Sequence, residues 1–259
     1  MNQSVLDPVP IWGVLILFTV VTFGCFEAGF RLGIWWQARE PGEQEGPTDM
    51  LVGSLLGLMA FVLAITLGLA TDRYDARRGL VVAEANALAT AYQRADYLSS
   101  AEAAQLKALL RAYVPLRIVT DPAAVPANIA ASAALARQMW TIAVAAAQSG
   151  NNSDLIASLG ESLNEIVTVG EQRVVAGVYA RVPQTIVFLL LAGSALSLAM
   201  VGYSAGIKGR RSMLSATVLI ITLGVVTTLV VDLDRPQEGL LKVSQQALVN
   251  VQRFMAAPS

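Results

Sequence analysis

The stretch LATDRYDARRGLVVAEANALATAY, residues 69–92, decides the fold. An uncharged apolar run of membrane-spanning length leads into it, and the stretch then opens with the charged residues Asp72, Arg73, Asp75, Arg77 and Arg78. Apolar residues at helical spacing continue beyond these charges at Leu80, Val81, Ala85, Leu88 and Tyr92. The pattern predicts a single helix that leaves the bilayer and continues outside it.

Composition places the chain among membrane proteins. Of its 259 residues, 14% are charged and 55% are hydrophobic, whereas soluble globular chains have about 25% charged residues. The net charge of −1 gives no basic surface for nucleic acid, so we do not expect nucleic acid as a partner. There is no histidine and one cysteine, Cys25, which excludes intrachain disulfides, His/Cys metal sites and Cys–His catalytic pairs. We therefore expect neither a metal nor a cofactor.

Segments of transmembrane length recur along the chain. A membrane-spanning helix needs about 20 predominantly apolar residues, and this requirement is met by residues 11–36, 50–71, 182–207 and 213–231. Trp12 lies near one end of the first segment and Trp35 near the other, as is typical of the two membrane interfaces. These features predict an all-α integral membrane protein with four transmembrane helices.

The spacing of these segments predicts four parts of the chain. We expect a first transmembrane helix pair at residues 1–71 and a helical extramembrane domain at residues 72–181. A second transmembrane helix pair is expected at residues 182–235, and a C-terminal tail at residues 236–259. The long insert between the second and third spans lacks the alternation of a strand and is predicted to be helical.

Capping residues divide the insert into helices. Ser99 and Glu102 have the spacing of a capping box, which predicts a helix start. Pro126 suits the first turn of the next helix, and Ser153 can cap another. Pro183 is predicted to mark the start of the third span, because proline interrupts a helix that would otherwise run on.

An even number of spans places both termini and the insert on one side of the membrane. Arginines that flank the insert, among them Arg73 and Arg181, favour a cytoplasmic insert. The short basic loop with Lys208, Arg210 and Arg211 favours the opposite orientation. We expect a multi-pass membrane protein whose insert and termini are cytoplasmic.

The second span has a stripe of small residues that predicts close helix packing. Gly53, Gly57, Ala60, Ala64 and Gly68 recur on one face, and small residues let helices approach closely in a bilayer. One interpretation is packing within the protomer. The other is packing around an oligomer axis, with the pore-lining residues Gly57, Phe61, Ala64, Ile65 and Gly68 forming a hydrophobic constriction that can gate by dewetting.

Charged residues gather at the predicted membrane edge. Asp232 and Asp234 end the fourth span, on the same side as the arginines of the opening stretch, and we expect the carboxylates to approach those arginines. The purely structural interpretation is a solvated interfacial salt-bridge cluster. The functional one is a charged pore mouth made of Asp72, Arg73, Arg77, Arg78, Asp232, Asp234 and Arg235.

Two further polar pairs are candidates for a role in function or packing. Glu27 and Arg31 are four residues apart in the first span and can form an intramembrane ion pair. Glu84 and Asn86 lie further along the continuing helix and can make polar contacts with a neighbouring helix. The sequence contains no nucleophile elbow, phosphate-binding loop or dinucleotide-binding glycine loop, so we expect no enzymatic activity.

The segments RYDARRGLVVAEANALATAY, residues 73–92, and VDLDRPQEGLLKVS, residues 231–244, resemble the bestrophin-like family of bacterial membrane proteins. The resemblance implies a homo-oligomer, expected to be a pentamer, with the second span lining a hydrophobic neck and the insert forming a cytoplasmic vestibule. It also implies a location in the bacterial inner membrane and passive ion flow, most often of anions. Among the aromatic residues only Phe61 is placed to line that neck, and no calcium-loop spacing of Asp and Glu is present.

The functional expectation is therefore an oligomeric anion channel whose partners are membrane lipid, other copies of itself and the permeating small ions. Two alternatives remain open from the residues. One is a non-conducting membrane scaffold or sensor whose insert binds a partner. The other is an ion-coupled transporter that depends on a carboxylate, for which Glu27 is the candidate.

Overall fold

The computed structural model describes residues 9–40, 45–119, 121–149, 153–179, 182–235 and 239–257. All regular elements in these ranges are helices, as the sequence predicts. The chain divides into two compact units. The first comprises Met1–Tyr74 and Arg181–Lys242, and the second comprises Asp75–Ala180 and Val243–Ser259. Helix α2 (Glu45–Arg94) belongs to both, because it runs without a break through the charged stretch. The single continuous helix predicted there is confirmed.

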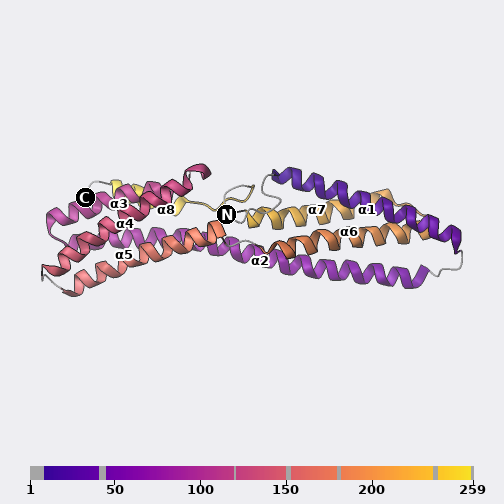
Figure 1. The fold of residues 1–259 in the computed structure, drawn as a ribbon, viewed down its shortest axis with the longest axis horizontal. Helices are drawn as coiled ribbons and strands as arrows, with labels where there is room; N and C mark the ends of the chain where they lie inside the picture. The colour runs from indigo at the N-terminus through magenta and orange to yellow at the C-terminus, as the bar shows by residue number, and fades with distance from the viewer. Residues whose placement is uncertain are drawn as a thin grey trace. The chain divides into compact units, whose positions relative to one another are not determined.

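The first unit contains the four helices predicted to span the membrane (Figure 1). These are α1 (Ile11–Arg39), the first part of α2, α6 (Gln184–Ile207) and α7 (Met213–Asp234). Each is long and apolar enough to cross a bilayer. A fifth helix, α4, also meets that criterion, with a lower mean hydropathy of 1.3.

Helices α1 and α6 pack backbone to backbone because glycines line their contact. A Cβ atom at Gly29 would lie 1.9 Å from the carbonyl oxygen of Ala199, and one at Gly202 would lie 2.0 Å from that of Phe26. One turn further, a Cβ at Gly33 would lie 2.3 Å from the carbonyl oxygen of Tyr203. Residue numbers rise together along the contact, so α1 and α6 run in the same direction.

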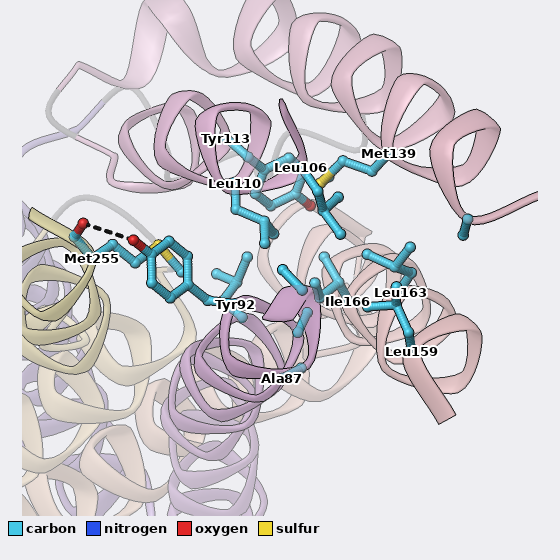
Figure 2. Packing of buried hydrophobic residues seen from close by; sticks show 14 of the residues in the cluster. Ala87, Tyr92, Leu106, Leu110, Tyr113, Met139, Leu159, Leu163, Ile166 and Met255 are labelled. Atoms are coloured by element: carbon cyan, nitrogen blue, oxygen red, sulfur yellow. Dashed lines mark hydrogen bonds between the residues drawn. The ribbon is translucent and has the colours of Figure 1, made fainter. Parts of the chain in front are cut away.

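The second unit is a separate helical domain built around its own apolar core. It contains the later part of α2 and the longer helices α3 (Ser100–Arg117), α4 (Val125–Gln148), α5 (Ser153–Val174) and α8 (Gln246–Ala256). Two short helices, η1 (Ala95–Tyr97) and η2 (Pro122–Ala124), join α2 to α3 and α3 to α4, and the π-helix η3 (Val175–Tyr179) follows α5. Figure 2 shows Leu106, Leu110, Met139 and Ile166 meeting in this core. Since α4 buries Met139, Ile142 and Ala146 here, it packs as a helix of this unit.

The C-terminal helix α8 belongs to this core, which the sequence pattern did not reveal. Leu248 and Met255 of α8 are buried. The Tyr92 hydroxyl donates to the Met255 carbonyl oxygen at 3.2 Å (Figure 2), and Arg111 Nε donates to the same oxygen at 2.8 Å. The last carbonyls of a helix lack partners within the helix, and these two side chains supply partners for one of them.

The predicted helix starts agree with the structure. Glu102 accepts hydrogen bonds from the backbone N–H and the hydroxyl of Ser99, at 3.3 and 2.6 Å, ahead of α3. Pro126 lies in the first turn of α4, and Pro183 is the N-cap residue of α6. Helix α5 begins at Ser153.

Candidate functional site

The predicted pore-lining residues form an exposed strip on α2. Gly57, Phe61, Ala64, Ile65 and Gly68 are all exposed, and we call them the exposed α2 strip. The opposite face of the same helix is buried in the first unit through Met59, Leu63, Thr66 and Ala70. The side chain of Phe61 is 63% exposed, although it is the largest apolar group of the strip.

The glycines of the second span have no packing partner within the part of the chain that the structure describes. A Cβ atom added at Gly53, Gly57 or Gly68 would meet no heavy atom of the described residues within 4 Å. Four glycines at the contact of α1 and α6 differ sharply, since a Cβ there would collide with backbone: Gly29, Gly33, Gly202 and Gly206. The interpretation that the α2 stripe packs within its own protomer is therefore not supported by the described residues.

Charges follow the exposed strip where α2 continues. Asp72 and Arg78 are exposed, Arg73 is half-buried, and the Arg77 side chain is buried at 5% exposure. Asp72 lies four residues after Gly68, so the two residues share a helix face. An acidic side chain therefore extends the exposed α2 strip beyond its apolar part.

Asp232 at the end of α7 binds backbone. Its two carboxylate oxygens accept the N–H groups of Leu240 and Leu241, at 2.9 and 3.0 Å, and the side chain is 2% exposed. Gly239, with φ +127°, lies against this carboxylate: a Cβ there would lie 2.2 Å from Asp232 Oδ1. The carboxylate thus holds the backbone at Leu240 and Leu241 against the end of α7, a role that the charge pattern did not reveal.

The neighbouring residues Asp234 and Arg235 also hold the chain at the end of α7. An Asp234 carboxylate oxygen accepts the backbone N–H of Val182 at 2.8 Å, just before α6 begins. Arg235 Nη2 donates to the Val9 carbonyl oxygen at 2.7 Å, just before α1 begins. These bonds tie together the chain segments at the ends of three helices in the first unit.

Glu27 lies between two arginines. Arg31 Nε donates to one of its carboxylate oxygens at 3.0 Å, and Arg211, in the loop between α6 and α7, pairs with the other. The guanidinium of Arg211 also lies over the ring of Phe30, 5.0 Å from its centroid. The sequence suggested Arg31 as a partner, but Arg211 is distant in sequence and was not anticipated.

Glu84 is the centre of a buried charge network in the second unit. Its side chain is fully buried, and its two oxygens accept Arg117 Nε at 2.5 Å and Arg173 Nη1 at 2.6 Å. Arg117 also donates to the Gly170 carbonyl oxygen at 3.0 Å, and Arg173 to Gln245 Oε1 at 3.4 Å. Glu84 therefore connects α2 to α3 and α5, whereas Asn86 is exposed.

Tyr113 borders this network, and its ring lies 5.9 Å from the guanidinium carbon of Arg117. Burial raises the pKa of Tyr113 to about 12, because the tyrosinate would lose its hydration, and the charge of Glu84 adds to this effect. Arg117 and Arg173 act in the opposite direction. The hydroxyl is therefore held neutral well into the alkaline range.

The chain matches a known family of membrane proteins. A model of the bestrophin-like domain matches residues 24–248, which is most of the chain. The chain belongs to the bestrophin-like family. A comparison with curated proteins finds no match.

Solved structures share the bestrophin-like fold. A crystal structure of a membrane protein is similar with a TM-score of 0.68 at 15% identity, over 95% of this chain and 97% of that one. A bacterial bestrophin homologue from Klebsiella pneumoniae is similar with a TM-score of 0.64 at 15% identity, over 93% of this chain and 96% of that one. At this identity, the similarity concerns the fold.

Three partners in the charge clusters of this bestrophin-like chain were missed by sequence reasoning: Arg117, Arg173 and Arg211. A signal for Arg117 existed, because it continues the buried face of α3 that includes Leu110 and Tyr113. A cation at a core position predicts a buried anion nearby, and Glu84 is that anion. Among the described residues, no group of three or more His, Cys, Asp or Glu is arranged to hold a metal ion.

Proposed function

We propose that this protein is an oligomeric membrane ion channel in which copies of the chain surround an axial pore lined by the exposed α2 strip. One observation carries the proposal: the exposed glycines Gly53, Gly57 and Gly68 of α2 have no packing partner among the described residues of their own protomer. Close helix approach drives association in a bilayer, where apolar burial alone gives no advantage over lipid. Copies of α2 arranged around a common axis are the simplest neighbours for this face.

Phe61 and Ile65 would form the constriction of such a pore. They are the large apolar side chains of the strip and stand among Gly57, Ala64 and Gly68. A narrow ring of apolar side chains can close a pore by excluding water, without a moving plug. The glycines would leave the pore wider on either side of that ring.

The charge of the permeating ion follows from what borders the constriction. Family resemblance implies an anion, and this is the first candidate. Asp72 favours a cation instead, because its exposed carboxylate continues the same helix face and rings of acidic side chains select cations. The two expectations differ in a measurable way, which is the preference for chloride or potassium.

The two alternatives are less well supported. Coupled transport through Glu27 requires a carboxylate that can exchange its ionic partner, but this carboxylate is paired with both Arg31 and Arg211. A scaffold that binds a partner through the second unit leaves the exposed α2 strip without a role. We further propose an inner-membrane location with the second unit and the termini in the cytoplasm, and a pentameric assembly, as family resemblance implies.

Cysteine substitution along α2 tests the pore. In a Cys25→Ala background, which has no other thiol, Gly57→Cys, Phe61→Cys and Gly68→Cys are introduced singly and the proteins are reconstituted in planar bilayers. A charged, membrane-impermeant thiol reagent should then change the current several-fold, because the modified side chains border the ion path.

The matched controls are Phe188→Cys on α6 and Leu214→Cys on α7, whose native side chains are 72% and 78% exposed. These positions should not respond, since exposure in the protomer there reflects contact with lipid. A current that responds at the control positions but not along α2 would remove the exposed α2 strip from the pore.

A further inference from the structure

One side of α1 carries a row of cationic and aromatic side chains at the end of its span. Arg31, Trp35 and Arg39 follow one another at four-residue intervals, and all three are exposed. They lie opposite the glycine face that α1 buries against α6. Arg211 joins the row through Glu27, which both it and Arg31 contact. We call these four residues the arginine–tryptophan strip.

The strip has an excess of positive charge. Its three guanidinium groups face one carboxylate, Glu27, among their described partners. Arg31 uses its Nε atom for this pair, and its side chain remains 78% exposed. Arg39 lies over the Trp35 ring, with its guanidinium carbon 4.0 Å from the centroid. Donor groups of Arg31 and Arg39 are therefore directed along an exposed surface.

The strip extends past the end of the neighbouring helix α6. Helix α6 ends at Ile207, and α1 passes this end at Gly33, where an added Cβ would lie 3.0 Å from Ile207 N. Since the two helices run in the same direction, Trp35 and Arg39 lie beyond the end of α6. Tryptophan is enriched at the interface between the hydrocarbon and the headgroups of a membrane.

We propose that the arginine–tryptophan strip binds the phosphate headgroup of an anionic phospholipid. Guanidinium groups match phosphate oxygens with paired hydrogen bonds, and basic clusters between or beside membrane helices bind anionic headgroups. The indole of Trp35 supplies an apolar surface for the upper acyl chain and glycerol region. Charge complementarity with an acidic lipid, together with the position at the end of a span, selects this occupant.

Tryptophan fluorescence measures this binding on the full chain. The purified protein in neutral detergent is titrated with brominated phosphatidylglycerol or brominated phosphatidylcholine, whose bromines quench nearby tryptophan. We expect half-maximal quenching at a lower concentration of phosphatidylglycerol than of phosphatidylcholine, and the ratio of the two concentrations measures the preference. The double variant Arg31→Gln/Arg39→Gln should lose this preference by about five-fold for each arginine removed, while Arg31→Lys/Arg39→Lys should keep most of it.

Arg137→Gln is the matched control, because Arg137 is an exposed arginine of the second unit, and it should leave the preference unchanged. Inorganic phosphate at the same concentration should not compete. Equal quenching by the two lipids, an unchanged preference in the double glutamine variant, or full competition by inorganic phosphate would each overturn the proposal.

Discussion

Glu84 and Arg117 form an ion pair of 2.5 Å between two helices of the second unit, where both side chains are buried. Arg173 binds the other oxygen of the same carboxylate. The network thus places two cations around one anion in the part of the chain that continues from the second span. Removing the anion leaves the buried guanidinium of Arg117 and the half-buried guanidinium of Arg173 without their shared counter-ion.

Glu84→Gln should therefore destabilise the second unit by about 3–5 kcal/mol, the typical cost of breaking a buried ion pair by removing one partner. Thermal unfolding followed by circular dichroism in detergent measures the change. Asn86→Ala on the same helix is the control, since Asn86 is exposed and its loss should cost less than about 0.5 kcal/mol. Equal stability of the two variants would show that the network does not hold α2, α3 and α5 together.

Tyr113 should make the stability of the second unit depend on pH in the alkaline range. Its pKa is raised from 10.0 to about 12 in the folded protein. Between these two values the unfolded chain has lost a proton that the folded protein keeps, so the free energy of unfolding falls as pH rises. We expect a decrease of about 2 kcal/mol from pH 10 to pH 12.

This titration is checked by measuring the free energy of unfolding of the wild-type chain and of Tyr113→Phe as a function of pH, and taking the difference. Other tyrosines and lysines titrate in both proteins, so their contributions cancel in the difference. The pH dependence described for Tyr113 should be absent from the phenylalanine variant. Parallel stability curves for the two proteins above pH 10 would contradict the assignment.

Gly29→Ala should disrupt the packing of α1 against α6. The new methyl group would lie 1.9 Å from the Ala199 carbonyl oxygen, so the two helices must separate, at a cost of about 1–3 kcal/mol or more. Gly24→Ala is the control on the same helix, because a Cβ there would meet nothing within 4 Å. Thermal unfolding of the purified proteins should show a lower melting temperature for Gly29→Ala, and no change for Gly24→Ala.

Phe61→Ala should raise the conductance or leave the channel constitutively open, because it removes the largest apolar side chain of the proposed constriction. Single-channel recording in planar bilayers measures this change. Phe188→Ala on α6 serves as the control, as its side chain is similarly exposed in the protomer and it is expected to face lipid. Unchanged conductance in Phe61→Ala would remove Phe61 from the neck.

Much of the fold is predictable from local sequence. The apolar runs, the capping pair Ser99–Glu102 and the unbroken periodicity through Arg77 depend on residues near one another in the chain, and the structure contains the corresponding helices. Helix α8 was missed because its amphipathic pattern is short, and its place in the core depends on contacts such as that between Tyr92 and Met255.

The charged residues were harder to interpret. Partners such as Arg211 for Glu27 are distant in sequence, so spacing along one helix cannot reveal them. Asp232 binds the backbone N–H groups of Leu240 and Leu241, and no side-chain pattern encodes that. The exposed α2 strip was recognisable from its small residues, but whether it packs within the protomer could be judged only with the three-dimensional fold.

Ion flux from liposomes tests the central claim most directly. The wild-type protein is purified, its oligomeric mass is measured, and it is reconstituted into liposomes loaded with chloride or potassium. We predict a defined oligomer that releases at least one of these ions passively. Chloride release would support the anion channel implied by family resemblance, and potassium release would support selection by Asp72. A well-formed oligomer that releases neither ion would contradict the account.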